Sequence, residues 1–211
     1  MSNKIRIKIC GMRDPENIIL VAELQPDYLG FIFYPKSKRF VGDDFKIPNQ
    51  LPKSIKRVGV FVNEATNRML ELATMHQLDV VQLHGNESVQ QCAELKGNGL
   101  GVIKIFQMAS DFEFSKINPY KKTVDYFLFD TKSESYGGTG KTFDWNLLNK
   151  YDQEIPFFLS GGLSVENIQG IKAMKEMNLH ALDINSGVEI SSGLKDNDKI
   201  KSLKELLTSN F

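Results

Sequence analysis

Two side chains with complementary acid–base chemistry stand at the ends of apolar stretches far apart in the chain. Cys10 follows the stretch 5–9, and Asp130 closes the stretch 126–129. A thiolate removes protons and a protonated carboxyl donates them, so the pair can take a proton from carbon and deliver one to oxygen, as sugar isomerisation requires. A free thiol has a pKa of about 8.5, so Cys10 needs help from its pocket or its substrate to ionise.

Each of these residues also has a simpler interpretation. A lone cysteine is more often a small buried apolar residue, which is what we expect for Cys92 on the same helix face as Val89 and Ala93. A carboxylate just after a strand can equally cap a helix or order a loop. Residue type alone therefore leaves the roles of Cys10 and Asp130 open.

Two glycine-containing segments late in the chain predict a phosphate site. Residues 160–162 read Ser-Gly-Gly, and residues 185–187 read Asn-Ser-Gly. Glycines let backbone amides approach an anion closely, and barrels of alternating strands and helices commonly bind phosphate after strands seven and eight. Either segment alone would suit an ordinary turn, but the two together favour phosphate contacts from Gly161, Gly162, Ser186 and Gly187.

A basic loop and one histidine complete the candidate site. Lys38 and Arg39 end the loop 34–39, where a guanidinium can grip a planar carboxylate, although a solvated basic turn is the commoner case. His84 follows the stretch 80–83 and is expected at the same end of the fold. The histidines and cysteines have no metal-ligand spacing, so we expect no metal.

The segment 135–142, Ser-Tyr-Gly-Gly-Thr-Gly-Lys-Thr, nearly matches the phosphate-binding pattern GxxxxGK[ST]. Ser135 replaces the first glycine, and the segment does not begin directly after a strand, so the match is weak. We expect instead a loop around Gly137 and Gly140 that closes over the site.

The elements that must position these residues alternate along the chain. Eight short apolar runs predict buried strands, at 5–9, 28–33, 58–62, 80–83, 102–106, 126–129, 157–159 and 181–184. Most are separated by amphipathic segments with helix-start residues, namely Asp14, Asn63, Asn86, Ser164 and Asp196. Pro48 and Pro52 break the segment 40–54, so only a turn or two is expected there. The pattern predicts an α/β fold, a (βα)8 TIM barrel with parallel strands that occupies residues 1–211 as a single domain.

Composition limits the partners. The 26 basic and 26 acidic residues give a formal net charge of zero, which favours neither nucleic acid nor an anionic membrane. No apolar run approaches the roughly 18 residues of a membrane span, and the N-terminus lacks a signal-peptide core. Two cysteines provide no disulfide framework. We expect a cytoplasmic protein with a small-molecule partner.

With these pieces placed, the chain resembles the phosphoribosylanthranilate isomerase family of tryptophan biosynthesis from end to end. The motifs that carry the resemblance are Lys-Ile-Cys-Gly-Met at 8–12, the segments 29–33 and 37–39, Val-Gln-Leu-His-Gly at 81–85, Phe-Asp at 129–130, 137–140, Phe-Asp-Trp at 143–145, 159–163 and 183–189. Ser160 and Asn185 depart mildly from the family's usual alanine and serine.

The resemblance implies an aldose–ketose isomerase, an intramolecular oxidoreductase that carries out an Amadori rearrangement of N-(5-phosphoribosyl)anthranilate without a cofactor. It implies that Cys10 is the general base, Asp130 the general acid and Arg39 the ligand of the anthranilate carboxylate. His84 and Asp183 would contact the middle of the substrate, and the state would be a monomer or homodimer. The alternatives are another phosphosugar isomerase and a catalytically silent barrel that binds a phosphate ligand.

Overall fold

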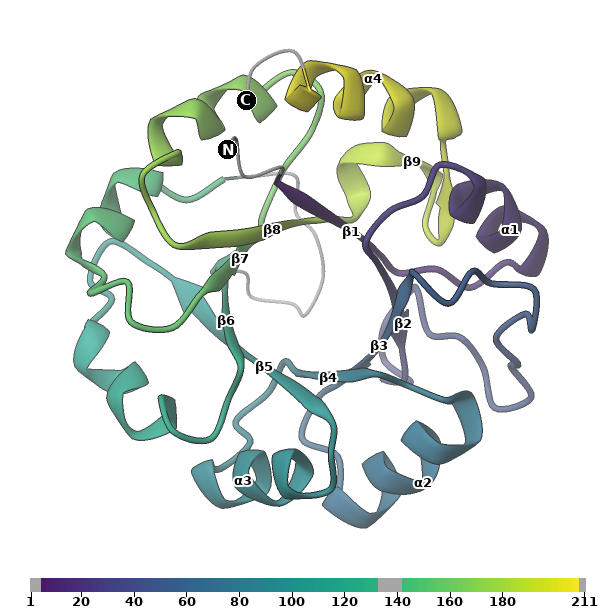
Figure 1. Ribbon diagram of the computed structural model, residues 1–211, viewed down its shortest axis with the longest axis horizontal. Coiled ribbons are helices and arrows are strands. Elements are labelled where there is room, and N and C mark those ends of the chain that lie inside the picture. The colour runs from purple at the N-terminus through teal and green to yellow at the C-terminus, as the bar shows by residue number, and fades with distance from the viewer. Residues whose placement is uncertain (1–4, 133–141, 209–211) are drawn as a thin grey trace.

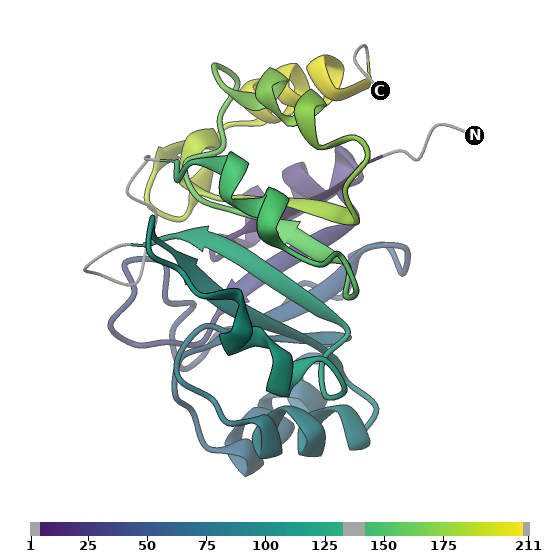
Figure 2. The same ribbon diagram turned by 90° about the vertical axis from the view of Figure 1, so that its left-hand side faces the viewer.

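Eight parallel strands close into a barrel in the computed structural model, which describes residues 5–132 and 142–208. Each strand pairs with the next along the chain, and β8 returns to β1 through the pairs Arg6–Ala181 to Ile9–Ile184. Helices surround the ring (Figure 1), and the strands cross the barrel obliquely in the side view (Figure 2). The predicted (βα)8 barrel is confirmed.

The strands are β1 (Arg6–Cys10), β2 (Tyr28–Ile32), β3 (Lys56–Phe61), β4 (Val80–Leu83), β5 (Gly101–Met108), β6 (Tyr126–Thr131), β7 (Phe157–Leu159), β8 (Leu179–Ile184), β9 (Glu189–Ser191) and β10 (Leu194–Lys195). The α-helices are α1 (Pro15–Glu23), α2 (Thr66–His76), α3 (Val89–Gly97) and α4 (Asn197–Thr208), and the 3₁₀ helices are η1 (Phe114–Tyr120), η2 (Trp145–Lys150), η3 (Ile168–Met174) and η4 (Ser186–Val188). All eight predicted strands are present, with ends that differ by up to two residues.

The helix starts were predicted less well than the strands. Asp14 caps α1 as expected, with its side chain accepting from the Asn17 amide. The predicted start at Asn63 was wrong: α2 begins after Ala65, and Asn63 has a left-handed φ of 52°. Ser88, not Asn86, caps α3, because Ser88 and Gln91 form a capping box.

Short 3₁₀ helices replace α-helices after β5, β6 and β7. The segment after Ser164 makes turns and then η3, whereas its 3.6-residue pattern had predicted an α-helix. Between β2 and β3 the prolines leave only turns, as expected, with Leu51 and Ile55 donating to the carbonyls of Pro48 and Pro52.

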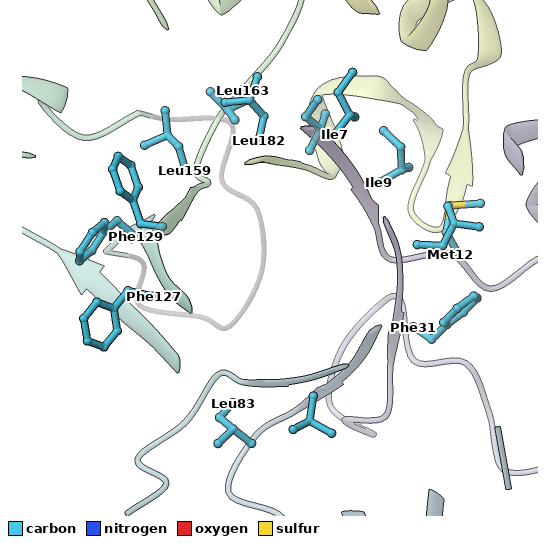
Figure 3. Packing of buried hydrophobic residues seen from close by; sticks show 14 of the residues in the cluster. Ile7, Ile9, Met12, Phe31, Leu83, Phe127, Phe129, Leu159, Leu163 and Leu182 are labelled. Atoms are coloured by element: carbon cyan, nitrogen blue, oxygen red, sulfur yellow. The ribbon is translucent and has the colours of Figure 1, made fainter. Parts of the chain in front are cut away.

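Strand alternation separates two apolar layers. Outward side chains such as Ile9, Phe31 and Phe129 pack against the surrounding helices and loops, and the labelled residues in Figure 3 point away from the barrel axis. A smaller inner cluster, including Val58, Ile105 and Phe158, fills the barrel. Residues in register with the inner cluster therefore point into the barrel, which is where a site can be built.

Three aspartates fix the start of the barrel strands at the end opposite the site. Asp27, Asp79 and Asp125 precede β2, β4 and β6, and each accepts a hydrogen bond from a backbone amide of the preceding strand at 2.8–2.9 Å. Two of them also pair with lysines, Asp79 with Lys56 and Asp125 with Lys96, each at 2.8 Å. This regular arrangement stabilises the N-terminal end of the barrel.

A hairpin of β9 and β10 follows η4 and was not predicted. The Asn17 side chain on α1 binds the backbone N–H and C=O of Lys195 at 2.8 and 2.9 Å, so the hairpin is tied to the first crossover helix. Its residues Glu189 and Lys195 are thereby brought back beside the barrel. No helix in the described ranges is both long and apolar enough to cross a membrane.

Candidate active site

One cavity opens at the C-terminal ends of the strands. All nine predicted site residues line it: Cys10, Arg39, His84, Asp130, Gly161, Gly162, Asp183, Ser186 and Gly187. The acid and base candidates thus line the same cavity although 120 positions separate them in the sequence. The cavity lies where barrels of this type carry their chemistry.

The strand ladder places the polar side chains on the inner face. Cys10 on β1, Gln82 on β4, Asp130 on β6 and Asp183 on β8 all fall at positions in phase with the inner apolar cluster. Gly30 on β2 pairs with Cys10, and a Cβ at Gly30 would lie 2.8 Å from the Cys10 sulfur. The glycine therefore leaves the room that the thiol occupies.

Cys10 is almost fully buried, and burial raises the pKa of its thiol above the usual value. The charge of Lys8, two residues earlier on the same strand, acts in the opposite direction, while that of Asp183 adds to the rise. Because a thiol must ionise to act as a base, the balance between these charges decides whether Cys10 can work. The contrasting Cys92 is buried on α3 outside the cavity, as expected.

Asp130 has the opposite requirement, because an acid must hold a proton to donate it. Burial raises the pKa of its carboxyl from 3.8 to about 6, and the charge of Asp183 adds to the rise. One oxygen accepts from the Thr131 amide at 2.8 Å, and the other lies 3.8 Å from Nε2 of His84. A carboxyl with this pKa can both hold and release a proton near neutral pH.

A chain of hydrogen bonds from Lys8 through Gln82 fixes the tautomer of His84. Lys8 donates to Oε1 of Gln82 at 2.8 Å, and an ammonium can only donate, so the amide oxygen must face Lys8. The amide nitrogen of Gln82 therefore donates to Nδ1 of His84 at 3.1 Å. Burial, aided by Lys8 and Lys104, lowers the pKa of His84 to about 3, so the ring is neutral. Its hydrogen must then sit on Nε2, the nitrogen that faces Asp130.

Arg39 is buried rather than solvated, which sets it apart from the exposed Lys38 beside it. Its Nε and Nη2 donate to the two carboxylate oxygens of Glu189 at 2.7 and 2.6 Å. Glu189 also accepts from Lys195 at 2.8 Å, and Lys195 binds Oδ1 of Asn185 at 2.7 Å. One edge of the guanidinium is thus held by Glu189, and within residues 5–132 and 142–208 no hydrogen bond from Nη1 is seen.

Burial lowers the pKa of Lys195 to about 8 although Glu189 opposes the change. Desolvation acts against the charged form of Glu189 as well, but Arg39 and Lys195 outweigh it and hold that pKa at about 2. The Arg39–Glu189–Lys195 network is therefore charged in the folded protein.

The two predicted phosphate loops form one wall of the cavity. Gly161 and Gly162 have φ values of 91° and 65°, a left-handed conformation that other residues rarely adopt. A Cβ at Gly187 would collide with the carbonyl of Leu163, so the loops after β7 and β8 touch each other there. The expected mobile loop at Gly137–Gly140 lies outside the described residues, as does most of the near-match to the nucleotide pattern.

Sequence reasoning assigned no role to four buried polar residues that hold the site together: Lys8, Gln82, Glu189 and Lys195. Lys8 and Gln82 interrupt apolar runs, and that pattern is the signal that could have found them. Glu189 closes the motif 183–189 of the family resemblance, but the residue pattern does not show where Glu189 and Lys195 lie, because their place depends on the hairpin. Among the described residues, no group of three or more His, Cys, Asp and Glu side chains is arranged to hold a metal.

Comparison with known proteins gives a consistent result. A family model described as N-(5'phosphoribosyl)anthranilate (PRA) isomerase matches residues 7–205. The N-(5'-phosphoribosyl)anthranilate isomerase of Parabacteroides distasonis is 47% identical over 199 residues, which cover 93% of this chain and 90% of the relative.

Solved structures agree. Phosphoribosyl anthranilate isomerase from Thermotoga maritima superposes with a TM-score of 0.84 at 36% identity, covering 97% of this chain and 99% of the other. A second isomerase structure, in complex with reduced 1-(o-carboxyphenylamino)-1-deoxyribulose 5-phosphate, gives 0.81 at 33% identity, with 97% and 99% covered.

Proposed function

The chain belongs to the N-(5'-phosphoribosyl)anthranilate isomerase family and is an isomerase of that substrate, and we propose that Cys10 is its general base and Asp130 its general acid. The observation that carries these roles is that both side chains line one cavity from separate strands. Asp130 protonates the ring oxygen as the furanose opens to a Schiff base, and Cys10 takes the proton from C2. The resulting enolamine tautomerises to the ketone.

The two charged ends of the substrate have separate places in the cavity. The phosphate lies against the backbone at Gly161, Gly162, Ser186 and Gly187, where the left-handed glycines support close approach of amides to an anion. The anthranilate carboxylate meets the free end of the Arg39 guanidinium. Holding both ends fixes C2 between acid and base, which supplies the orientation that the reaction needs.

His84 and Asp183 contact the middle of the substrate. The Nε2–H of His84 points into the cavity toward Asp130, so it donates to a substrate oxygen near the acid. Asp183 lines the same cavity and accepts from substrate hydroxyl groups. Neither residue is needed to carry a proton in this scheme.

The wider setting follows from the family. We propose a cytoplasmic enzyme of tryptophan biosynthesis whose residues 1–211 form one catalytic domain and whose only small-molecule partner is the phosphosugar substrate, with no cofactor and no nucleic acid. Met75 and Ile190 are exposed apolar side chains, of the kind that contact with a second copy of the chain would bury. We propose a monomer or homodimer.

Turnover of phosphoribosylanthranilate, followed by loss of its fluorescence, tests the roles. Cys10→Ala and Asp130→Asn should each lower kcat by orders of magnitude while the protein still binds substrate, and Cys92→Ala is the matched control that should keep normal turnover. Near-normal turnover in either site variant refutes the role assigned to it. Saturable binding without consumption by the unaltered protein would instead indicate a silent phosphate-binding barrel.

A further inference from the structure

A fully buried ammonium lies inside the barrel beneath the candidate base. Lys8 and Cys10 are two residues apart on β1, so their side chains point the same way, and Lys8 has no exposed surface. Lys8 Nζ donates to Asp183 at 2.7 Å and to Gln82 at 2.8 Å, which places it on the barrel interior. It does not line the cavity, so its effect on the reaction passes through neighbouring residues. A buried lysine is costly, and the proposed mechanism gives it no task.

The charges around the cavity indicate what this ammonium does. Lys8, Arg39 and Lys195 contribute three buried positive charges, while Asp183 and Glu189 contribute two negative ones. When Asp130 holds the proton that an acid must donate, the set is left with one excess positive charge. A thiolate at Cys10 neutralises that excess, because buried charges require a partner. The microstate needed for catalysis is therefore one of two balanced microstates, the other having Asp130 ionised and Cys10 protonated.

We propose that Lys8 is a positioning residue that stabilises the thiolate of Cys10, its ammonium being fixed below the sulfur by Asp183 and Gln82. Asp183 limits this effect because it competes with the sulfur for the same ammonium. The inference rests on the proposed role of Cys10 as base, and it identifies a charge that opposes the effect of burial on the thiol.

Electrostatic effects on the two groups agree with this assignment. The charge of Lys8 and hydrogen bonding from it both act to lower the pKa of Cys10 against the effect of burial, whereas Asp183 raises it. Burial acts to lower the pKa of Lys8 itself, but the attraction of Asp183 and of Cys10 outweighs it, so the ammonium stays charged. Lys195 also lowers the pKa of Cys10, but its charge is shared with Glu189.

The test is the pKa of Cys10 in the free, full-length protein, measured from the ultraviolet absorbance of the thiolate. Each variant is compared with the same variant carrying Cys10→Ala, so that only Cys10 is observed. Lys8→Met should raise the pKa, and every unit of rise lowers the thiolate fraction about tenfold below the pKa. Asp183→Asn should lower the pKa, because the sulfur becomes the nearest anion to the ammonium.

Two further variants separate charge from packing. The double change Lys8→Met with Asp183→Asn removes the buried pair together, which protects folding, and should give a higher Cys10 pKa than Asp183→Asn alone. Lys104→Met removes another buried strand lysine that pairs with a carboxylate, Glu87, and should leave the Cys10 pKa unchanged.

An unchanged Cys10 pKa in Lys8→Met, or equal values for Asp183→Asn with and without Lys8→Met, overturns the proposal. So does a shift of the same size in Lys104→Met, since that would mark a general effect of losing a buried pair. The role of Cys10 as base is judged separately, by the turnover of Cys10→Ala, so either idea can fail without the other.

Discussion

Replacing Asp130 by Asn should stabilise the folded protein while it lowers turnover by orders of magnitude. Burial raises the pKa of this carboxyl from 3.8 to about 6, which means that the folded state opposes its ionisation. One pKa unit corresponds to about 1.4 kcal/mol, so a rise of about two units costs the folded state roughly 3 kcal/mol at neutral pH. Asparagine is neutral and can still accept from the Thr131 amide, so we expect a gain of about 1–3 kcal/mol.

The gain should depend on pH in a defined way. Well below pH 3.8 the carboxyl is protonated in both the folded and unfolded protein, so the charge-related difference between Asp130 and the Asn variant vanishes. As the pH rises, the Asp130 carboxyl ionises first in the unfolded chain. The free energy of unfolding of the unaltered protein therefore falls relative to that of the variant, until the pH passes about 6 and the carboxyl ionises in the folded protein as well. Above that value the difference is constant.

Urea denaturation of both proteins between pH 4 and pH 8 measures this difference directly. Asp183→Asn is the matched control, because it removes a carboxylate that pairs with Lys8 at 2.7 Å and should destabilise the protein instead. If the unaltered protein and Asp130→Asn have the same free energy of unfolding, or if their difference does not grow between pH 4 and pH 6, the claim that the folded state opposes ionisation of Asp130 is refuted.

Three other changes test the carboxylate contact of Arg39, the tautomer of His84 and the N-terminal end of the barrel. Arg39→Ala should raise KM about 10- to 100-fold with kcat little changed, since one charge-assisted contact is lost, and an effect confined to kcat would contradict its role as a clamp. Gln82→Met should lower kcat about tenfold, because His84 is then free to carry its proton on Nδ1; an unchanged kcat would remove the tautomer argument. Asp125→Ala should lower the free energy of unfolding by about 1–2 kcal/mol with kcat and KM unchanged, as urea denaturation and steady-state kinetics would show.

Local patterns in the sequence were sufficient to predict the barrel and the strand ends that carry Cys10 and Asp130. The reason is that a parallel strand buried on both faces leaves an apolar run, and a polar residue that ends such a run must lie at the mouth. Helix starts were less certain, because the best cap depends on which hydrogen bonds the following turn makes, as Ser88 and Gln91 show on α3.

The charged network behind the site was not predictable in the same way. Glu189 and Lys195 are separated by 150 and 156 positions from Arg39, and their meeting depends on a hairpin too short to leave a periodic pattern. Lys8 did leave a signal, an isolated lysine between Ile7 and Ile9, but a charged residue within an apolar run can be interpreted only when its partners are known. Asp183 and Gln82 come from β8 and β4, and only closure of the barrel brings them to Lys8.

The same side chain thus serves opposite purposes at the two ends of the barrel. At the N-terminal end, Asp27, Asp79 and Asp125 each accept a backbone hydrogen bond from a neighbouring strand, so their carboxylates are supported by the fold. At the C-terminal end, Asp130 is buried near Asp183, where its negative charge is opposed. A carboxylate whose charged form is stabilised by the fold does not readily take up a proton near neutral pH. A carboxyl whose charged form is opposed by the fold has a raised pKa and can exchange a proton with a ligand. Catalysis therefore requires the barrel to give up stability at the position where the proton moves.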